Sequence, residues 1–193
     1  VGLLVCLVLF EGGLNLKLPE GNVRNTVLRI SLLRLIISLA GGVLIAHVFA
    51  GLSWSVAAVY SSIVLATGPT VITPLVEQIK LTSPLSSVLK AEGLVLEPIG
   101  AVLALLILEL LLGDLHGIKE VFIALMQRLG GGVLIGLIAG WLLSEILKKI
   151  KSDSSLGIEL QVTVGIIFLV YGICEYFLPE SGLPASVAAG FIV

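Results

Sequence analysis

Residues 86–112, SSVLKAEGLVLEPIGAVLALLILELLL, decide the fold class of this chain. After Glu92 the stretch is apolar except for Glu97 and Glu109, and it is longer than the roughly 20 residues with which an α-helix crosses a bilayer. A lipid-exposed strand edge would leave backbone N–H and C=O groups without partners, whereas a helix pairs them within the segment. The run is also too long and too continuous for a strand of a transmembrane barrel. It therefore predicts a transmembrane helix.

The whole chain has the composition of a membrane protein. Hydrophobic residues make up 58% of its 193 positions and charged residues 12%, whereas a soluble domain carries about 25% charged residues. Complete or nearly complete spans are predicted at 28–50, 55–76, 86–112, 129–147 and 158–178. Shorter spans are predicted at 1–10 and 183–193, and 118–128 is predicted as an amphipathic extension of the span that follows it. The predicted fold class is all-α, a polytopic transmembrane helix bundle, with residues 1–193 forming part of one transmembrane domain that is truncated at both ends.

Charge, cysteine and glycine patterns narrow the interpretation of this bundle. The net charge is −2, so there is no basic field that would favour nucleic acid, and no nucleic-acid partner is expected. Cys6 and Cys174 both lie in apolar runs, which indicates small buried hydrophobic residues more than a disulfide or a metal pair. Gly132, Gly136 and Gly140 recur on one helix face, which indicates close helix packing.

Basic residues in the connections predict the orientation of the spans. The connections 51–54, 113–117 and 175–182 contain no Lys or Arg, whereas Lys119 and Arg128 lie on the amphipathic segment. Arg34 lies inside the predicted span 28–50, and the other basic residues lie in or flank the alternate connections, at Lys17, Arg24, Arg29, Lys80, Lys90, Lys148, Lys149 and Lys151. By the positive-inside rule these alternate connections are cytoplasmic.

The run 55–76 is interrupted by the sequence TGPT at 67–70, with Pro74 one turn further on. Pro69 has no N–H to donate to the carbonyl of Leu65, and glycine weakens a helix further. Two explanations remain open at this point. The helix is broken, so that free carbonyls face a cation as in secondary transporters, or it is only kinked, with threonine hydroxyls bonding the freed carbonyls.

Glu97 lies near the middle of the run 86–112. A carboxylate at membrane depth costs several kcal/mol unless it is paired, protonated or hydrated, so an acid there is a functional candidate. Pro98 frees the carbonyl of Leu94 and adds a second oxygen nearby. Hard cations such as sodium prefer oxygen ligands. The sequence thus predicts a carboxylate that holds either a proton or a cation; a protonated Glu hydrogen-bonded between helices is the alternative.

Two further acids have other predicted roles. Glu92 precedes Glu97 by five residues and so points about 140° away round the helix. We therefore predict that Glu92 forms a structural salt bridge with a basic group. Glu11 ends the first apolar run, and from the residues alone it is read as a capping or headgroup-level acid.

Four motifs together resemble the NhaP-type branch of the monovalent cation:proton antiporters, the sodium/hydrogen exchanger family. They are FEGGL at 10–14, ATGPT at 66–70, AEGLVLEPIGA at 91–101 and ESGLPASVAAGFIV at 180–193. Each motif alone is weak, but their order and spacing are specific, and the match runs over most of the chain.

The resemblance implies an inverted-repeat bundle with a dimerisation domain and a six-helix core domain, in which two broken helices cross at the bilayer midplane. The run 55–76 would be one of these broken helices. The family's ligands for a transiently held sodium ion fall on Glu11, on the backbone carbonyl of Thr67 and on Glu97. The family's structural acid, which pairs with an Arg on a later helix, falls on Glu92.

Gly68, Pro69 and Gly93 complete the segment that the resemblance assigns to cation and proton binding, and here the chain departs from many members. Gly68 stands where many have an acid, and Gly93 stands where many have a Ser ligand. Leu96 and Glu97 stand where many have Asn-Asp. Glu97 keeps the carboxylate with one more methylene group, so the site has fewer side-chain ligands than is common in the family.

We therefore predict a secondary active transporter, not an enzyme, that exchanges a monovalent cation for protons, with Glu97 binding each in turn. Protonation would release the cation, and cation binding would expel the proton. Na+ is the expected cation, and K+ and Li+ are the other candidates. No cofactor is expected. The expected partners are the transported ions, the lipid bilayer and a second copy of the chain in a homodimer, in a plasma (inner) membrane.

Three alternatives remain open. A potassium-preferring antiporter or an ion channel of related fold would use similar residues, but flux that saturates and depends on a counter-ion distinguishes an antiporter. An intramembrane protease would need a Ser–His or paired-Asp site, whereas the predicted spans contain no Asp and His47 has no convincing serine partner. A purely structural subunit leaves the position of Glu97 without a reason.

Overall fold

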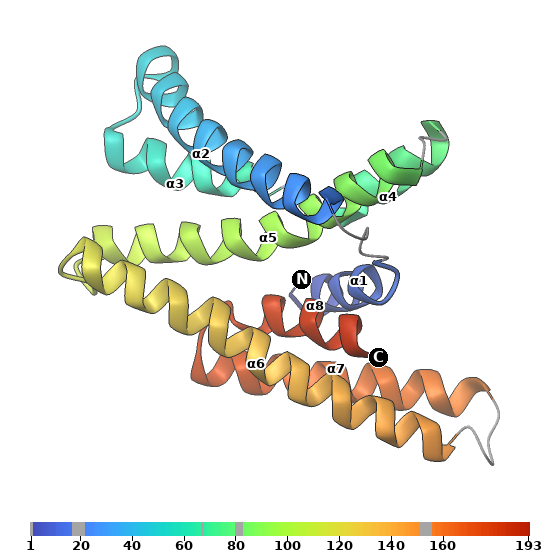
Figure 1. The fold of residues 1–193 in the computed structure, drawn as a ribbon. Helices are drawn as coiled ribbons and strands as arrows, with labels where there is room; N and C mark the ends of the chain where they lie inside the picture. The colour runs from blue at the N-terminus through green and yellow to red at the C-terminus, as the bar shows by residue number, and fades with distance from the viewer. Residues whose placement is uncertain (1, 17–21, 67, 80–82, 151–155) are drawn as a thin grey trace. The chain divides into compact units, whose positions relative to one another are not determined.

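The computed structural model describes residues 2–16, 22–66, 68–79, 83–150 and 156–193, and within these ranges every regular element is an α-helix (Figure 1). The helices are α1 (Gly2–Leu14), α2 (Asn22–Ala50), α3 (Trp54–Leu65), α4 (Pro69–Ile79), α5 (Ser83–Leu112), α6 (Ile118–Ile150), α7 (Leu156–Phe177) and α8 (Gly182–Ile192). The predicted all-α fold class is confirmed.

Four of the described helices are long and apolar enough to cross a membrane. They are α2, α5, α6 and α7, with candidate spans at Arg29–Ala50, Leu85–Leu112, Ile118–Ile150 and Gly157–Phe177. These match the predicted spans 28–50, 86–112, 129–147 and 158–178. α6 begins at Ile118 without a later interruption, so the amphipathic segment 118–128 is continuous with the span that follows it.

The predicted span 55–76 is divided into two helices. α3 ends at Leu65, and Ala66 leaves the helical conformation with φ −69° and ψ 97°. The N–H of Ala66 donates to the carbonyl of Ile63 at 3.3 Å, so the last turn of α3 is tighter than an α-helical turn. The first half of the span therefore stops inside the apolar run.

α4 begins at Pro69, where a proline is tolerated because the first N–H groups of a helix have no intrahelical acceptor. The carbonyl of Gly68 accepts from the N–H groups of Val71 at 3.1 Å and Ile72 at 3.4 Å. Gly68 thus closes the first turn of α4 and is not part of α3. The prediction of a broken helix is confirmed, and the alternative of a simple kink is not.

The chain divides into two compact units. The first contains Val1–Leu16 and Gln127–Val193, and the second contains Lys17–Met126. The broken helix and the two acids of α5 therefore belong to the second unit, whereas Glu11 belongs to the first.

In the first unit, α8 is the most enclosed helix, and nearly all of its residues are buried. Three glycines of α6 approach the α8 backbone so closely that a methyl group on any of them would collide with it; they are Gly132, Gly136 and Gly140. On its other side α8 approaches α1, where Gly13 lies against the backbone at Val187 and Gly190 lies against that of Phe10. The predicted close packing along the glycine face of α6 is confirmed.

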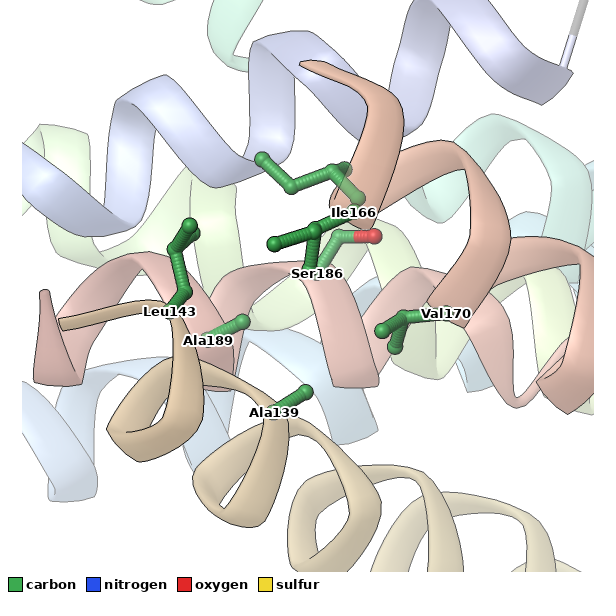
Figure 2. Close-up of a pocket in the computed structure, with 7 residues that line it drawn as sticks. Ala139, Leu143, Ile166, Val170, Ser186 and Ala189 are labelled. Carbon is green, nitrogen blue, oxygen red and sulfur yellow. The ribbon is translucent and has the colours of Figure 1, made fainter. Parts of the chain in front are cut away.

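A small cavity lies between α6, α7 and α8 (Figure 2). Its volume of about 10 Å³ is near the lower limit for one water molecule. The lining is apolar except for Ser186, whose hydroxyl donates to the carbonyl of Gly182 at 2.8 Å. Neither its size nor its lining suits a cation, so it is a packing gap. Cys6 and Cys174 are buried free thiols in the same unit, as predicted.

In the second unit, α2 and α3 form a hairpin that is fixed at its turn and along its length. The ring of His47 stacks on Trp54 with 3.9 Å between ring centroids, and its Nδ1 lies 2.7 Å from the carbonyl oxygen of Leu52. Farther along, the Ser61 hydroxyl of α3 donates to the carbonyl of Leu39 in α2 at 2.9 Å. α5 packs against α2, α3 and α4. The first half of the broken helix is therefore held between α2 and the helix that carries the acids.

Candidate functional site

Glu97 lies near the middle of α5, within the candidate span Leu85–Leu112. Its side chain is partly buried, and its Oε2 atom is buried without a hydrogen-bond partner in the described part of the chain. A carboxylate oxygen in such a place has lost its hydration, and a bound proton or cation would compensate for that loss. Glu97 is therefore an acid whose described surroundings leave it unsatisfied.

The face of α5 that carries Glu97 also carries two glycines. Gly93 and Gly100, four residues before and three residues after Glu97, share that face and are both buried. At Gly100 an added methyl group would lie 3.1 Å from the carbonyl oxygen of Ser62 and 3.2 Å from the Cβ atom of Ala66. Glu97 therefore lies on the face of α5 that packs against the last turn of α3, directly before the break.

The break itself joins two helix ends of opposite polarity. The last carbonyls of α3 lack intrahelical donors and carry partial negative charge, and the first N–H groups of α4 carry partial positive charge. The carbonyl of Leu65 has no donor four residues on, because that residue is Pro69. Thr67, whose carbonyl is a predicted ligand, lies outside the described residues. The break thus offers backbone oxygens, the ligand type that hard cations prefer, close to an unsatisfied carboxylate.

Glu92 meets a different neighbour. Its side chain is 5% exposed, and its Oε1 atom lies 3.1 Å from Nη1 of Arg34 in α2. Oε1 has no hydrogen-bond partner among the described residues, so its contact with Arg34 is an ion pair by distance whose angle falls outside hydrogen-bond geometry. The 140° between the two acids of α5 thus corresponds to separate contacts of this helix with α2 and α3. Among the described residues, the basic partner of Glu92 is Arg34, which lies on an earlier helix than Glu92. The resemblance implied an Arg on a later helix.

Sequence reasoning missed Arg34 and Gly100 as residues that frame the site. A signal for Arg34 was present, because a charged residue inside an apolar run needs a partner of opposite charge and Glu92 needed a cation. For Gly100 the signal was the spacing of two glycines round Glu97 on one helix face. Neither signal names the helix that lies opposite.

Glu11 lies on α1, in the first unit, and its side chain is exposed. Its backbone carbonyl accepts from the N–H and from the side-chain amide of Asn15, each at 3.0 Å. These bonds close the end of α1. The role of Glu11 as a cation ligand stays a prediction.

A second group of charged side chains lies in the first unit, around the turn between α7 and α8. Glu180 occupies this turn with φ 64°, a left-handed conformation that is uncommon outside glycine, and its N–H donates to Oε1 of Glu175 at 3.0 Å. Burial raises the pKa of Glu180, the Glu175 carboxylate raises it further, and Arg128 lowers it. This group includes the positive charge of Arg128, which the surroundings described for Glu97 lack, and its hydrogen bond from Glu180 to Glu175 holds the turn.

The family model described as "Sodium/hydrogen exchanger, transmembrane" matches residues 1–193, which is the whole chain. No curated protein matches the chain. The matched region includes the broken helix, the acid-bearing helix α5 and the four long apolar helices. The chain therefore belongs to the sodium/hydrogen exchanger family, whose members are multi-pass membrane transporters, not enzymes, that exchange cations for protons.

Proposed function

We propose that this exchanger binds Na+ and protons alternately at Glu97. The observation that carries the proposal is the buried Oε2 atom of Glu97, which has no hydrogen-bond partner in the described ranges and lies on the face of α5 that packs against the broken helix. A cation or a proton would satisfy this oxygen equally well, but the carboxylate does not accommodate both at once.

The exchange step is a competition for one carboxylate. In the protonated state the side chain is neutral and holds its proton on an oxygen. When Na+ enters, the O–H bond breaks, the proton leaves to water, and the carboxylate becomes a ligand of the cation. The reverse step releases Na+ when a proton returns. Both loaded states are electrically neutral at this carboxylate, so neither leaves an uncompensated charge at membrane depth.

Backbone oxygens complete the proposed site. The carbonyls of Thr67 and of Leu65, which has no donor at Pro69, supply hard oxygen ligands that Gly93 and Leu96 do not. The carbonyl of Gly68 already accepts from the N–H groups of Val71 and Ile72. Because the backbone oxygens are fixed to the break, site geometry is set by how closely α3 and α5 approach each other.

The pair of Glu92 and Arg34 has a separate role in this proposal. Nη1 of Arg34 lies 3.1 Å from Oε1 of Glu92, so the positive charge of Arg34 compensates the charge of this carboxylate. Glu97 is then the single exchanging acid of α5. Transport proceeds by alternating access, with a core domain moving against a dimerisation domain in a homodimer, and the proposed location is a plasma (inner) membrane.

The test is cation-driven proton movement in proteoliposomes. The complete protein is reconstituted with an internal pH dye, a proton gradient is imposed, and Na+, K+ or Li+ is added. We compare wild type with Glu97→Gln and with the control Glu145→Gln, which alters an exposed acid paired with Lys148 on α6. Wild type and the control should collapse the gradient with saturation in Na+, and Glu97→Gln should not. Equal activity in Glu97→Gln would refute the proposal, and a stronger response to K+ would refute the preference for Na+.

A further inference from the structure

We infer that Gly100 is a positioning residue that sets the gap between Glu97 and the break in α3–α4, and through this gap the cation preference of the exchanger. The inference rests on the proposed function, because it takes Glu97 as the exchange site. It concerns a residue that binds no ion itself. Its effect comes from the absence of a side chain where two helices meet.

The contact at Gly100 is tight against three atoms of α3 and the residue that ends it. An added methyl group would lie 3.1 Å from the carbonyl oxygen of Ser62, 3.2 Å from the Cβ atom of Ala66 and 3.3 Å from the backbone nitrogen of Ala66. Two of these three atoms are backbone atoms, which move only with the helix. A side chain at Gly100 would therefore push α5 and α3 apart by a few tenths of an ångström.

The displaced part of α3 is the part that forms the break. Ala66 is the residue that ends α3, and its N–H is bonded to Ile63 instead of Ser62. The carbonyl of Ser62 that faces Gly100 thus belongs to the last, tightened turn. The hydroxyl of Ser62 is occupied within its own helix, where it donates to the carbonyl of Val59 at 2.8 Å. The contact is therefore made by backbone and the methyl group of Ala66 on the α3 side and by a glycine on the α5 side, with no flexible side chain to absorb a change.

Glu97 moves with Gly100 because one helical turn joins them. Residues three apart on a helix lie on the same side, so a shift of α5 away from Ala66 is also a shift of Glu97 away from the break. The distance from the carboxylate to the backbone oxygens then grows by a similar amount. Among oxygen-ligated sites, cavity size and ligand flexibility separate smaller from larger cations, so a wider gap favours K+ over Na+ and Li+.

The experiment uses the complete protein in proteoliposomes and compares apparent KM and maximal rate for Li+, Na+ and K+. Gly100→Ala is compared with wild type and with Gly165→Ala. Gly165 lies on α7 with no atom within 4 Å of an added methyl group, so the control makes the same change in a helix without a new contact. Because misplacing a catalytic group by 1 Å costs about 10²-fold, a few tenths of an ångström should raise the KM for Na+ relative to that for K+ by roughly three- to tenfold.

A second variant should narrow the gap between α3 and α5, and it does so without introducing a larger residue. Ala66→Gly removes the methyl group on the α3 side at a position that is already non-helical, so it lets α5 come closer. It should lower the KM for Na+ relative to that for K+, and in the double variant with Gly100→Ala it should restore part of the wild-type ratio. Maximal rates should stay within about twofold, since only positioning changes.

Three results would overturn the inference. The first is an unchanged Na+ to K+ ratio of KM in both variants. The second is an equal change for all three cations, which would indicate a general loss of structure. The third is the same ratio shift in Gly165→Ala. Failure of the proposed function is separate and visible in the same assay, because it requires Glu97→Gln to retain cation-dependent proton movement.

Discussion

Two close helix contacts, one in each unit, differ in whether the polar side chains beside them have hydrogen-bond partners. Along the contact of α6 with α8, three glycines of α6 admit the α8 backbone, and the nearby hydroxyls of Ser181 and Ser186 both donate to backbone carbonyls. At the contact of α3 with α5, Gly100 admits the α3 backbone in the same way. One turn away, however, Glu97 keeps a buried oxygen without a partner in the described residues.

The difference separates a structural contact from a functional one. Lipid tails are as apolar as the side chains of a membrane helix, so close backbone packing and internal hydrogen bonding hold such helices together. In the first unit the two serine hydroxyls are bonded, and the buried Oε2 atom of Glu175, which has no hydrogen-bond partner in the described residues, belongs to a charged group that includes Arg128. Such a contact has no need of a ligand. A contact with an unsatisfied carboxylate does, and a proton or a cation can meet that need.

The largest effect on stability is expected from a variant that gives α5 a second carboxylate without a partner charge. Arg34→Met would produce one, because it removes the cation beside Glu92, whose side chain is 5% exposed. We expect a loss of about 3 kcal/mol in the free energy of unfolding, at the lower end of the range for a broken buried pair, because Arg34 is itself 35% exposed. Denaturant titration of the complete protein in detergent micelles measures this loss.

The matched control is the double variant Arg34→Met with Glu92→Met. Replacing both members of a buried ion pair by apolar residues is often close to neutral, so the double variant should recover most of the stability. If the double variant is as unstable as Arg34→Met, the loss comes from packing of the Arg34 side chain and not from an uncompensated charge.

A smaller effect is expected from changing the structural contact. Gly136→Ala places a methyl group against the backbone of Ala185, 2.8 Å from its Cα atom. Such overpacking costs about 1–3 kcal/mol, which outweighs the gain of about 1 kcal/mol from replacing glycine in a helix. The same denaturant titration checks this, with Gly165→Ala as the variant that should not lose stability. Equal stability of the two variants would show that α6 and α8 are not in close contact.

The smallest predicted effect concerns the turn between α7 and α8, where acids are partly buried together. The pKa of Glu180 in the folded protein is above its ordinary value of 4.5, first because of burial and then because of Glu175. The folded state therefore binds this proton more readily than the unfolded chain does, so this contribution to stability is present below pH 4.5 and falls as pH rises through the raised pKa.

Thermal unfolding of the complete protein between pH 4 and pH 8 tests this sign. Wild type should lose stability relative to Glu180→Gln as pH rises, because glutamine does not titrate. A pH-independent difference, or one of opposite sign, would show that the surroundings of Glu180 favour its charged form.

The residues alone predicted the helices and the position of the interruption, because both depend on local signals, whereas the choice of a break over a kink came from the resemblance. An apolar run longer than 20 residues is a candidate span wherever it lies, and Pro69 after Gly68 interrupts a helix whatever packs around it. The spacing of Glu92 and Glu97 also placed the two acids on different sides of α5, because helical geometry fixes that angle.

The partners across helices could not be read in this way. That Arg34 meets Glu92 depends on α2 packing against α5, and that Gly100 meets Ala66 depends on the depth at which α3 stops. Both follow from tertiary packing, which local signals in a single sequence do not reveal. The resemblance supplied a role for Glu92 but placed its cation on a later helix, and only the packed bundle brings Arg34 to it.

The central claim is that one carboxylate holds either a proton or a cation. Isothermal titration calorimetry of the purified complete protein with Na+, in buffers of different ionisation enthalpy, counts the protons released for each cation bound. We predict about one proton released per Na+ in wild type, and neither release nor tight binding in Glu97→Gln. Na+ binding to wild type without proton release, or unchanged release in Glu97→Gln, would contradict the claim.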